Sequence, residues 1–275
     1  MGEKSDNRDI PQGMVSALAS ERAFIGIAAL IFACSTALTI VWGVSMSAMG
    51  VMDMPGGWTM SMTWMLMPGQ TWAGAAVVFL GMWVVMMVAM MMPSLAPMLW
   101  RYRQAVDKTD HTRLGWLTAL VGAGYFLVWT MFGLAAFPVG VVLATLEMLH
   151  PALARAVPVA AGVVLVTAGV LQFTPWKARH LACCRQMPGR DRTLTARAGT
   201  AWRHGLRLGL HCSRCCFSQM AVLLVIGVID LRAMAIVAVA ITVERLAPGG
   251  QRIAIATGVV AVAAGMFLIV QANGL

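Results

Sequence analysis

The feature that most constrains this chain is a series of apolar segments, each about 17 to 25 residues long. A helix of that length crosses the roughly 30 Å of hydrocarbon in a lipid bilayer. Of the 275 residues, 60% are hydrophobic and only 11% are charged, whereas a soluble domain carries about 25% charged residues. Too few polar side chains are present to cover a surface facing water. We therefore expect an all-α fold, a polytopic transmembrane helix bundle.

The apolar segments predict about seven spans, or six if the fifth and sixth form one helix. Asp230 and Arg232 interrupt a long apolar stretch, and we place a tight turn there because one continuous helix would exceed the bilayer. Pro93 predicts a kink in the second span, since proline removes a backbone hydrogen bond. The predicted spans are roughly 23–46, 71–99, a segment within 114–146, 157–174, 209–229, the following segment to 247, and 253–271.

The lysine and arginine residues predict the orientation of these spans. Of the 20 basic residues, all but Arg155 and Arg232 fall in segments that this layout puts on one side. Basic loops concentrate on the cytoplasmic side of a membrane, so we expect a cytoplasmic tail at 1–22 and one transmembrane domain at 23–275. The loop at 47–70 then faces outward and the basic loop at 175–207 faces the cytoplasm. The net charge of +9 is assigned to orientation and lipid contact, and no nucleic-acid partner is expected.

Methionine is concentrated in one part of the chain. Of the 23 methionines, 15 lie between Met46 and Met98. The first eight of these are Met46, at the end of the first span, and seven in the outward loop, and two interpretations stay open for them. They either form a thioether-rich site for a soft metal, or they are adaptable apolar contacts in a segment at the membrane interface.

Inside the second predicted span, Met82, Met86 and Met90 recur every four residues, with Met87 and Met91 in step. Such residues stack along a helix. Packing alone explains many methionine stripes. Continuity with the methionine-rich loop favours a path for Cu(I), because an uncharged thioether binds this ion in a medium of low dielectric constant.

The densest group of metal-binding residue types lies at the start of the fifth predicted span, within HCSRCCFSQM at 211–220. Cys212 and Cys215 form a Cys-X-X-Cys pair, and Cys212, Cys216 and Met220 share one helical face. The alternative is a set of small buried cysteines without ligands. With His211 included, the segment predicts a site for copper(I), with zinc as the alternative metal.

A second group consists of His180, Cys183 and Cys184 in the predicted cytoplasmic loop. It is either a chance grouping or a mobile acceptor that completes the site of the fifth span, because Cu(I) needs only two or three soft ligands and Zn(II) takes four. Cysteines in the reducing cytoplasm are expected as free thiols. Cys34, alone in the first span, is expected to be a packed thiol.

Together these motifs resemble a bacterial family described as predicted metal-binding integral membrane proteins of unknown function. The resemblance covers roughly 81–245 and implies membrane location and metal binding. It is carried by MWVVMMVAMMMPS at 82–94, by the Cys-X-X-Cys-Cys-X-X-X-Met segment at 212–220 and by Glu244-Arg245. Arg214 and Phe217 stand where that family usually has Gly and Trp, so the local backbone and charge are expected to differ.

The function that we expect is Cu(I) transport or delivery across the bacterial cytoplasmic membrane through Met and Cys ligands. Membrane lipid, a soft metal ion and other membrane or metallochaperone proteins are the expected partners. Two alternatives stay open, a transmembrane thiol–disulfide oxidoreductase that uses Cys212 and Cys215, and a membrane subunit that holds a structural metal. The sequence contains no P-loop, nucleophile elbow or His-Glu-X-X-His motif, so we expect no enzymatic activity.

Overall fold

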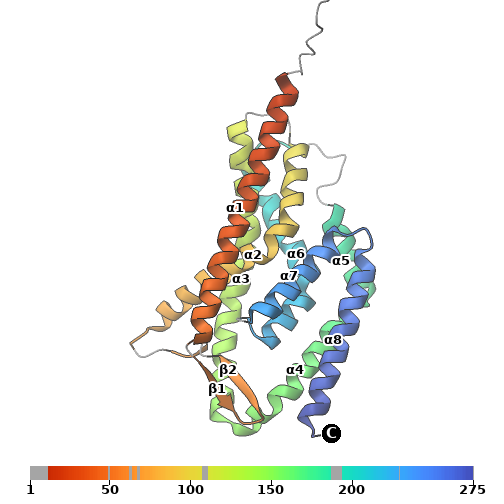
Figure 1. Cartoon of the computed structure of the whole chain (residues 1–275). Helices are drawn as coiled ribbons and strands as arrows, with labels where there is room; N and C mark the ends of the chain where they lie inside the picture. Colours follow the sequence, from red (N-terminus) through yellow and green to blue (C-terminus); the bar gives the residue numbers. More distant parts are fainter. Residues whose placement is uncertain are drawn as a thin grey trace, which may run out of the picture.

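The fold is a bundle of helices with one small hairpin (Figure 1). The computed structural model describes residues 12–48, 50–61, 64–66, 69–106, 111–186, 194–228 and 230–274. Within these ranges the elements are α1 (Gln12–Ala48), β1 (Val51–Met54), β2 (Trp58–Ser61), α2 (Trp72–Ala105), α3 (His111–Leu149), α4 (Pro151–Gln172), α5 (Pro175–Gln186), α6 (Ala198–Ile226), α7 (Leu231–Leu246) and α8 (Gly250–Ala272).

Six helices of the described chain are long and apolar enough to cross a membrane, namely most of α1 together with α2, α3, α4, α6 and α8. This confirms the predicted helical bundle of membrane type. The predicted turn in the long apolar stretch is also present, because α6 ends at Ile226 and the Asp230 side chain accepts hydrogen bonds from the backbone N–H groups of Arg232 and Ala233 at the start of α7. Helix α7 has 16 residues, fewer than the about 20 that a span needs.

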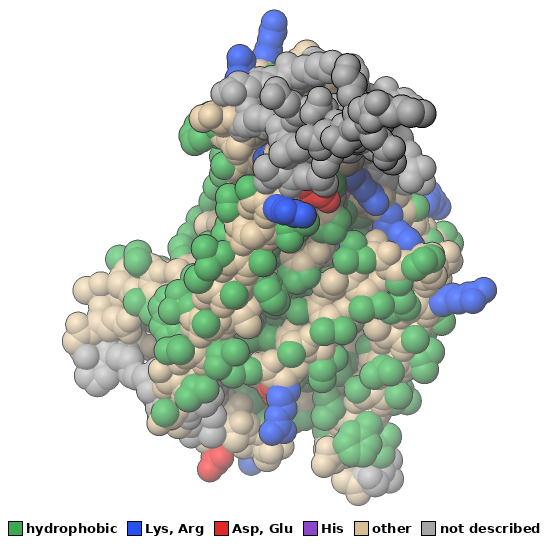
Figure 2. Space-filling view, turned by 45° about the horizontal axis from the view of Figure 1, so that its top comes forward, with side chains coloured by type: hydrophobic (Ala, Val, Ile, Leu, Met, Phe, Trp, Pro, Cys, Tyr) green, Lys and Arg blue, Asp and Glu red, His purple; other side chains and the backbone are tan. Residues whose placement is uncertain are grey.

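The outer surface of the bundle is apolar, as a lipid-facing surface requires. Helix α1 exposes large side chains along its length, among them Ile27, Leu30 and Val41. Figure 2 shows hydrophobic side chains over the middle of the molecule, with most Lys and Arg side chains gathered in its upper half. Residues 1–11 of the predicted tail, and the basic residues Lys108, Arg190 and Arg192, lie outside the described residues.

The outward methionine-rich loop contains a β-hairpin that the sequence did not predict. β1 pairs antiparallel with β2, and the pairs Met52–Met60 and Met54–Trp58 put four large side chains on one face. Met54 and Met60 are buried against Ala144 of α3 and Ala154 of α4. Packing is therefore a role of these two methionines. Three other methionines of the loop lie outside the described residues, Met49, Met62 and Met67.

The segment at 175–207, predicted as a loop, is largely helical in its described part. It contains α5, and α6 begins at Ala198 instead of near Gly209. The reason is an amphipathic pattern, because Ala201, Leu208 and Cys212 are buried on one face whereas Arg203 and Arg207 are exposed. Because charged residues lie on its outer face, this part of the chain is not a continuous apolar segment, and the apolar length of the segments did not predict the helix there.

Glycines allow the close helix contacts on which the bundle depends. A Cβ atom on Gly209 of α6 would lie 2.9 Å from the backbone oxygen of Tyr125 of α3, and one on Gly205 would collide with the backbone oxygen of Val121. Small residues that let backbones approach closely are typical of membrane helix interfaces. The contact brings α3 against the turn of α6 that precedes Cys212. Helices α4 and α8, which lie side by side in Figure 1, approach in the same way through Gly162 with Gly265 and Gly169 with Gly258.

We predict that Gly205→Ala destabilises the protein by about 1 to 3 kcal/mol, because the added methyl group overpacks the contact with Val121. Gly199→Ala on the same helix is the matched control, since a Cβ atom there meets nothing within 4 Å and alanine favours a helix. Thermal unfolding of both variants in detergent measures the difference. Equal midpoints for the two variants would contradict the close approach of α3 and α6.

Candidate functional site

One face of α6 carries the predicted cysteine ligands into the core. Cys212, Cys215 and Cys216 are buried, whereas Arg214 and Phe217 on the other side of the helix are exposed. The Sγ atoms of Cys212 and Cys216 lie 3.9 Å apart, one helical turn from each other. The helix therefore presents two thiols side by side inside the bundle.

Cys212 lies where four helices meet. Tyr125 of α3 donates a hydrogen bond from Oη to the Cys212 Sγ at 2.9 Å, and Arg245 of α7 donates from Nη1 at 3.2 Å. The same Nη1 lies 2.9 Å from Ser94 Oγ of α2, and Nη2 lies 3.3 Å from the Sδ atom of Met98. One guanidinium group thus joins a thiol of α6 to a thioether of α2.

The predicted methionine stripe lies inside the bundle. Met86 and Met90 are buried and Met82 is partly buried, and they pack in the same hydrophobic core as the cysteines of α6. Met98, which contacts Arg245, was missed in the analysis of the sequence. Steps of four residues from Met82 lead through Met86, Met90 and Ser94 to Met98, so a longer stripe would have found it. Five further methionines are buried in the same core, namely Met87, Met91, Met92, Met220 and Met234.

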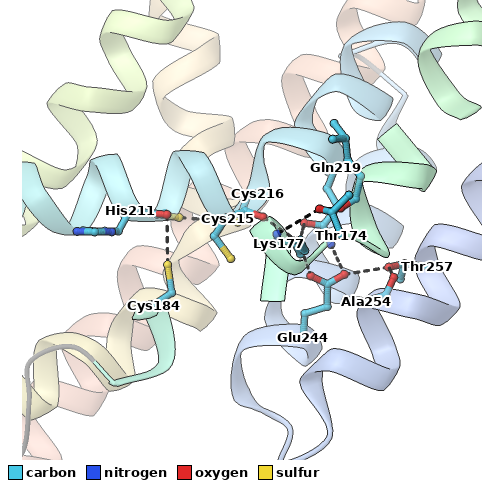
Figure 3. A network of polar contacts seen from close by, with 12 residues as sticks. Thr174, Lys177, Cys184, His211, Cys215, Cys216, Gln219, Glu244, Ala254 and Thr257 are labelled. Carbon is cyan, nitrogen blue, oxygen red and sulfur yellow. Dashed lines mark hydrogen bonds and ion pairs between the residues drawn. The ribbon is translucent and has the colours of Figure 1, made fainter. Parts of the chain in front are cut away.

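The adjacent cysteines of α5 contact α6 in different ways. The Sγ atom of Cys183 lies 3.8 Å from Nδ1 of His211, whereas Cys184 is buried and donates a hydrogen bond to the backbone oxygen of His211 at 3.2 Å (Figure 3). His180, also predicted as a ligand, has its Nδ1 atom 2.8 Å from the backbone oxygen of Trp176. Its ring is tilted against the Trp176 ring, with the two centroids 4.4 Å apart. The structure thus separates a half-buried pair, Cys183 and His211, from the buried thiols.

The Cys184 thiol belongs to the buried group. Its interaction with the Cys215 side chain raises the pKa of this thiol above the ordinary value, and burial raises the pKa further. The thiol form of Cys184 is therefore favoured, in keeping with its hydrogen bond to the backbone oxygen of His211. Four of the predicted cysteine ligands, Cys184, Cys212, Cys215 and Cys216, are buried. Cys34 is exposed on α1 and is not the packed thiol that was expected.

Arginine side chains hold α5 in position beside α6. Arg185, near the end of α5, donates hydrogen bonds to the backbone oxygens of Ala247 and Pro248 in the turn between α7 and α8. Arg101 of α2 in turn donates to the backbone oxygen of Arg185 at 2.5 Å. These contacts fix the helix that carries Cys183 and Cys184, which was expected to be a mobile segment.

A buried ion pair lies next to the cysteines. Lys177 Nζ of α5 is 2.8 Å from a carboxylate oxygen of Glu244 on α7, and it donates a hydrogen bond to the backbone oxygen of Cys215 at 2.8 Å. The other carboxylate oxygen of Glu244 accepts hydrogen bonds from Gln219 Nε2 at 2.6 Å and from Thr257 Oγ1 of α8 at 2.9 Å (Figure 3). The carboxylate is fully partnered, so the pair satisfies the requirement for a buried charge.

The charged residues of this region had other roles in the predictions. Lys177 was assigned, with the other basic residues, to the orientation of the spans, and Glu244 was named only as part of the family resemblance. Both side chains are about 1% exposed. The sequence did mark Glu244-Arg245, because this pair carried the family resemblance. The partners of the two side chains lie on α2, α5, α6 and α8, too far away in the sequence to be recognised from it.

The spacing of Cys212 and Cys216 fits two ligands of one soft ion. With a metal–sulfur distance of about 2.3 Å, as in zinc thiolates, two ligands of one ion lie at most about 4.6 Å apart; the observed separation is 3.9 Å. Among the described residues, no group of three His, Cys, Asp or Glu side chains lies close enough together to hold a metal ion. The arrangement offers a pair of thiols with thioethers nearby.

Comparison with known proteins identifies a family. Residues 80–268 match the family PpoB2, described as copper chaperone. The chain belongs to this copper chaperone family. The matched range contains α6, α7 and most of α2, and with them Cys212, Arg245 and Met98. No curated protein and no solved structure matches the chain.

Membership of the copper chaperone family bears on the predicted metal. It supports copper handling, and it agrees with the metal-related bacterial family that the sequence resembles over 81–245. The individual ligands stay predictions, namely Met82, Met86, Met90, His180, Cys183, Cys184, His211, Cys212, Cys215, Cys216 and Met220. The geometry adds Met98 to this set.

We predict that Glu244→Gln lowers the free energy of unfolding by about 3 to 5 kcal/mol, because it leaves the Lys177 ammonium group buried without its counter-ion. The double variant Lys177→Met with Glu244→Gln removes both charges and should recover a large part of that loss. Thermal unfolding of the single and double variants in detergent measures both effects. A double variant less stable than Glu244→Gln would show that the pairing of the two charges does not stabilise the fold.

Proposed function

We propose that this protein binds Cu(I) within the membrane through sulfur ligands and delivers it across the cytoplasmic membrane of a bacterium. The observation that carries the proposal is the buried thiol pair of Cys212 and Cys216, joined through Arg245 to the thioether of Met98. Thiolates and thioethers are the ligands that Cu(I) prefers. Membership of a copper chaperone family supports the choice of metal.

The methionines of α2 form the proposed path to the thiols. Met82, Met86 and Met90 follow the helix toward Ser94 and Met98, and Met86 and Met90 pack in the same core as Cys212. A chain of thioethers can hold a monovalent ion at low dielectric constant without burying carboxylates. Movement toward the cysteines follows the order of ligand strength, because a thiolate binds Cu(I) more tightly than a thioether does.

The half-buried pair of Cys183 and His211 forms the proposed exchange point with other proteins. Their side chains approach within 3.8 Å at the contact between α5 and α6, and neither is as deeply buried as Cys184 or Cys212. A metallochaperone thiol could reach ligands in such a position. With the N-terminus in the cytoplasm, as the basic residues favour, this exchange occurs on the cytoplasmic side.

The protein acts as a carrier and not as an enzyme in this proposal. Copper is the cargo, and zinc is the less suitable metal because a structural Zn(II) site takes four ligands, whereas Cys212 and Cys216 supply two adjacent thiols. The exposed basic residues act in orientation and lipid contact. The remaining partners are membrane lipid and the proteins that supply or receive copper.

Metal analysis of the purified protein tests the proposal most directly. We predict that the wild type, loaded with Cu(I) under reducing conditions, retains copper after desalting and that a variant with Cys212, Cys215 and Cys216 replaced by Ser loses it. Cys34→Ser is the matched control, because Cys34 is exposed on α1, and it should retain copper. Equal copper content in the wild type and the triple variant would refute the thiol site.

The double variant Met86→Leu with Met90→Leu tests the path along α2. Leucine keeps the volume and apolar character of these positions, so the fold should lose less than about 1.5 kcal/mol per site, whereas copper uptake into vesicles should be lost. Copper bound at the cysteines of detergent-purified protein should be unchanged. The control is Met131→Leu with Met266→Leu, two methionines that are each 51% exposed. Uptake at the wild-type rate in the double variant would rule out conduction through this stripe.

A further inference from the structure

The buried charges of the bundle do not balance. Among the described residues, the charged side chains that are fully buried are Lys177, Glu244 and Arg245. Lys177 and Glu244 neutralise each other at 2.8 Å, and in this part of the chain no carboxylate lies within ion-pair distance of Arg245. One positive charge is therefore left over beside the thiols of α6.

The positive charge of Arg245 is permanent, and its hydrogen-bond partners are a hydroxyl oxygen, a cysteine sulfur and a thioether sulfur. A guanidinium group does not lose its proton in proteins. Its Nη atoms contact Ser94 Oγ, Cys212 Sγ and Met98 Sδ, and its Nε atom has no hydrogen-bond partner among the described residues. A charge buried without a counter-ion is costly, so a negative charge at the cysteines would be favoured.

Metal binding changes this balance according to the charge of the ion. A cysteine must be deprotonated to bind a metal. The thiolates of Cys212 and Cys216 together with one monovalent ion carry a net charge of −1, which cancels Arg245. The same pair with a divalent ion is neutral and leaves Arg245 uncompensated. A third thiolate bound to a divalent ion would restore the balance. Among the described residues, however, no three His, Cys, Asp or Glu side chains lie close enough together to bind one metal ion.

We propose that Arg245 makes the thiol pair selective for soft monovalent ions, Cu(I) and Ag(I), over soft divalent ions such as Cd(II) and Zn(II). This inference rests on the proposed function, because it assumes that Cys212 and Cys216 bind metal. Arg245 acts through charge and does not bind the ion. Selectivity then comes from the electrostatic balance of a buried site as well as from the softness of its ligands.

Competition between Ag(I) and Cd(II) for the purified full-length protein in detergent tests the inference. Wild type is expected to prefer Ag(I). Arg245→Gln should lower the ratio of Ag(I) to Cd(II) affinity at least about tenfold, because it removes the uncompensated charge that opposes a divalent ion. Arg245→Lys keeps the charge and should keep most of the preference, and Arg214→Gln, which removes an exposed charge from the same segment of α6, should keep all of it.

A second variant tests the inference in a protein that keeps Arg245, so the test does not depend on whether Arg245→Gln folds. Ser94→Asp puts a carboxylate next to Arg245, whose Nη1 atom lies 2.9 Å from Ser94 Oγ, and so neutralises the arginine in place. Ser94→Asp should lower the ratio of Ag(I) to Cd(II) affinity as Arg245→Gln does, whereas its uncharged control Ser94→Asn should not. A wild-type ratio in Arg245→Gln or in Ser94→Asp would overturn the inference while the proposed function stands. A wild type that binds neither ion would overturn both.

Discussion

The structure depends on one buried cation. The Arg245 guanidinium contacts Ser94 and Met98 of α2 and Cys212 of α6, and Cys212 also accepts a hydrogen bond from Tyr125 of α3. Each of these contacts requires a separation close to 3 Å, so the positions of four helices are coupled. The glycines of α6 make this possible, because Gly205 and Gly209 let α3 approach closely enough for Tyr125 to reach Cys212.

Helix α7 is too short to count among the candidate spans. Its importance lies in its last turn, which carries the charged residues Glu244 and Arg245. Glu244 faces α5 and α8 and binds Lys177 and Thr257, whereas its neighbour Arg245 faces α2 and α6. Adjacent residues on a helix point about 100° apart, so one turn supplies opposite charges to two separate polar groups. The same principle separates Cys183 from Cys184 on α5, where one thiol meets the His211 ring and the other enters the core.

Methionine can fill a core and bind a soft ion with the same side chain, because its sulfur atom is uncharged and polarizable. Met54 and Met60 of the hairpin are buried against α3 and α4, and packing accounts for their position. Met86 and Met90 pack in the core that also contains Cys212, Cys215 and Cys216. The neighbours of a methionine, more than its abundance, therefore distinguish a packing role from the proposed ligand role.

The sequence by itself determined the architecture and part of the candidate site. Apolar length defined the spans, and helical periodicity placed Cys212 and Cys216 on one face. Apolar length could not find α5 or the start of α6, because charged residues cover their outer faces. Only the tertiary structure decided that Arg245 lies between Cys212 and Met98, 147 positions from the latter, and that Lys177 neutralises Glu244. Periodicity tells which face of a helix a residue occupies, whereas the partner of that face depends on how the helices pack.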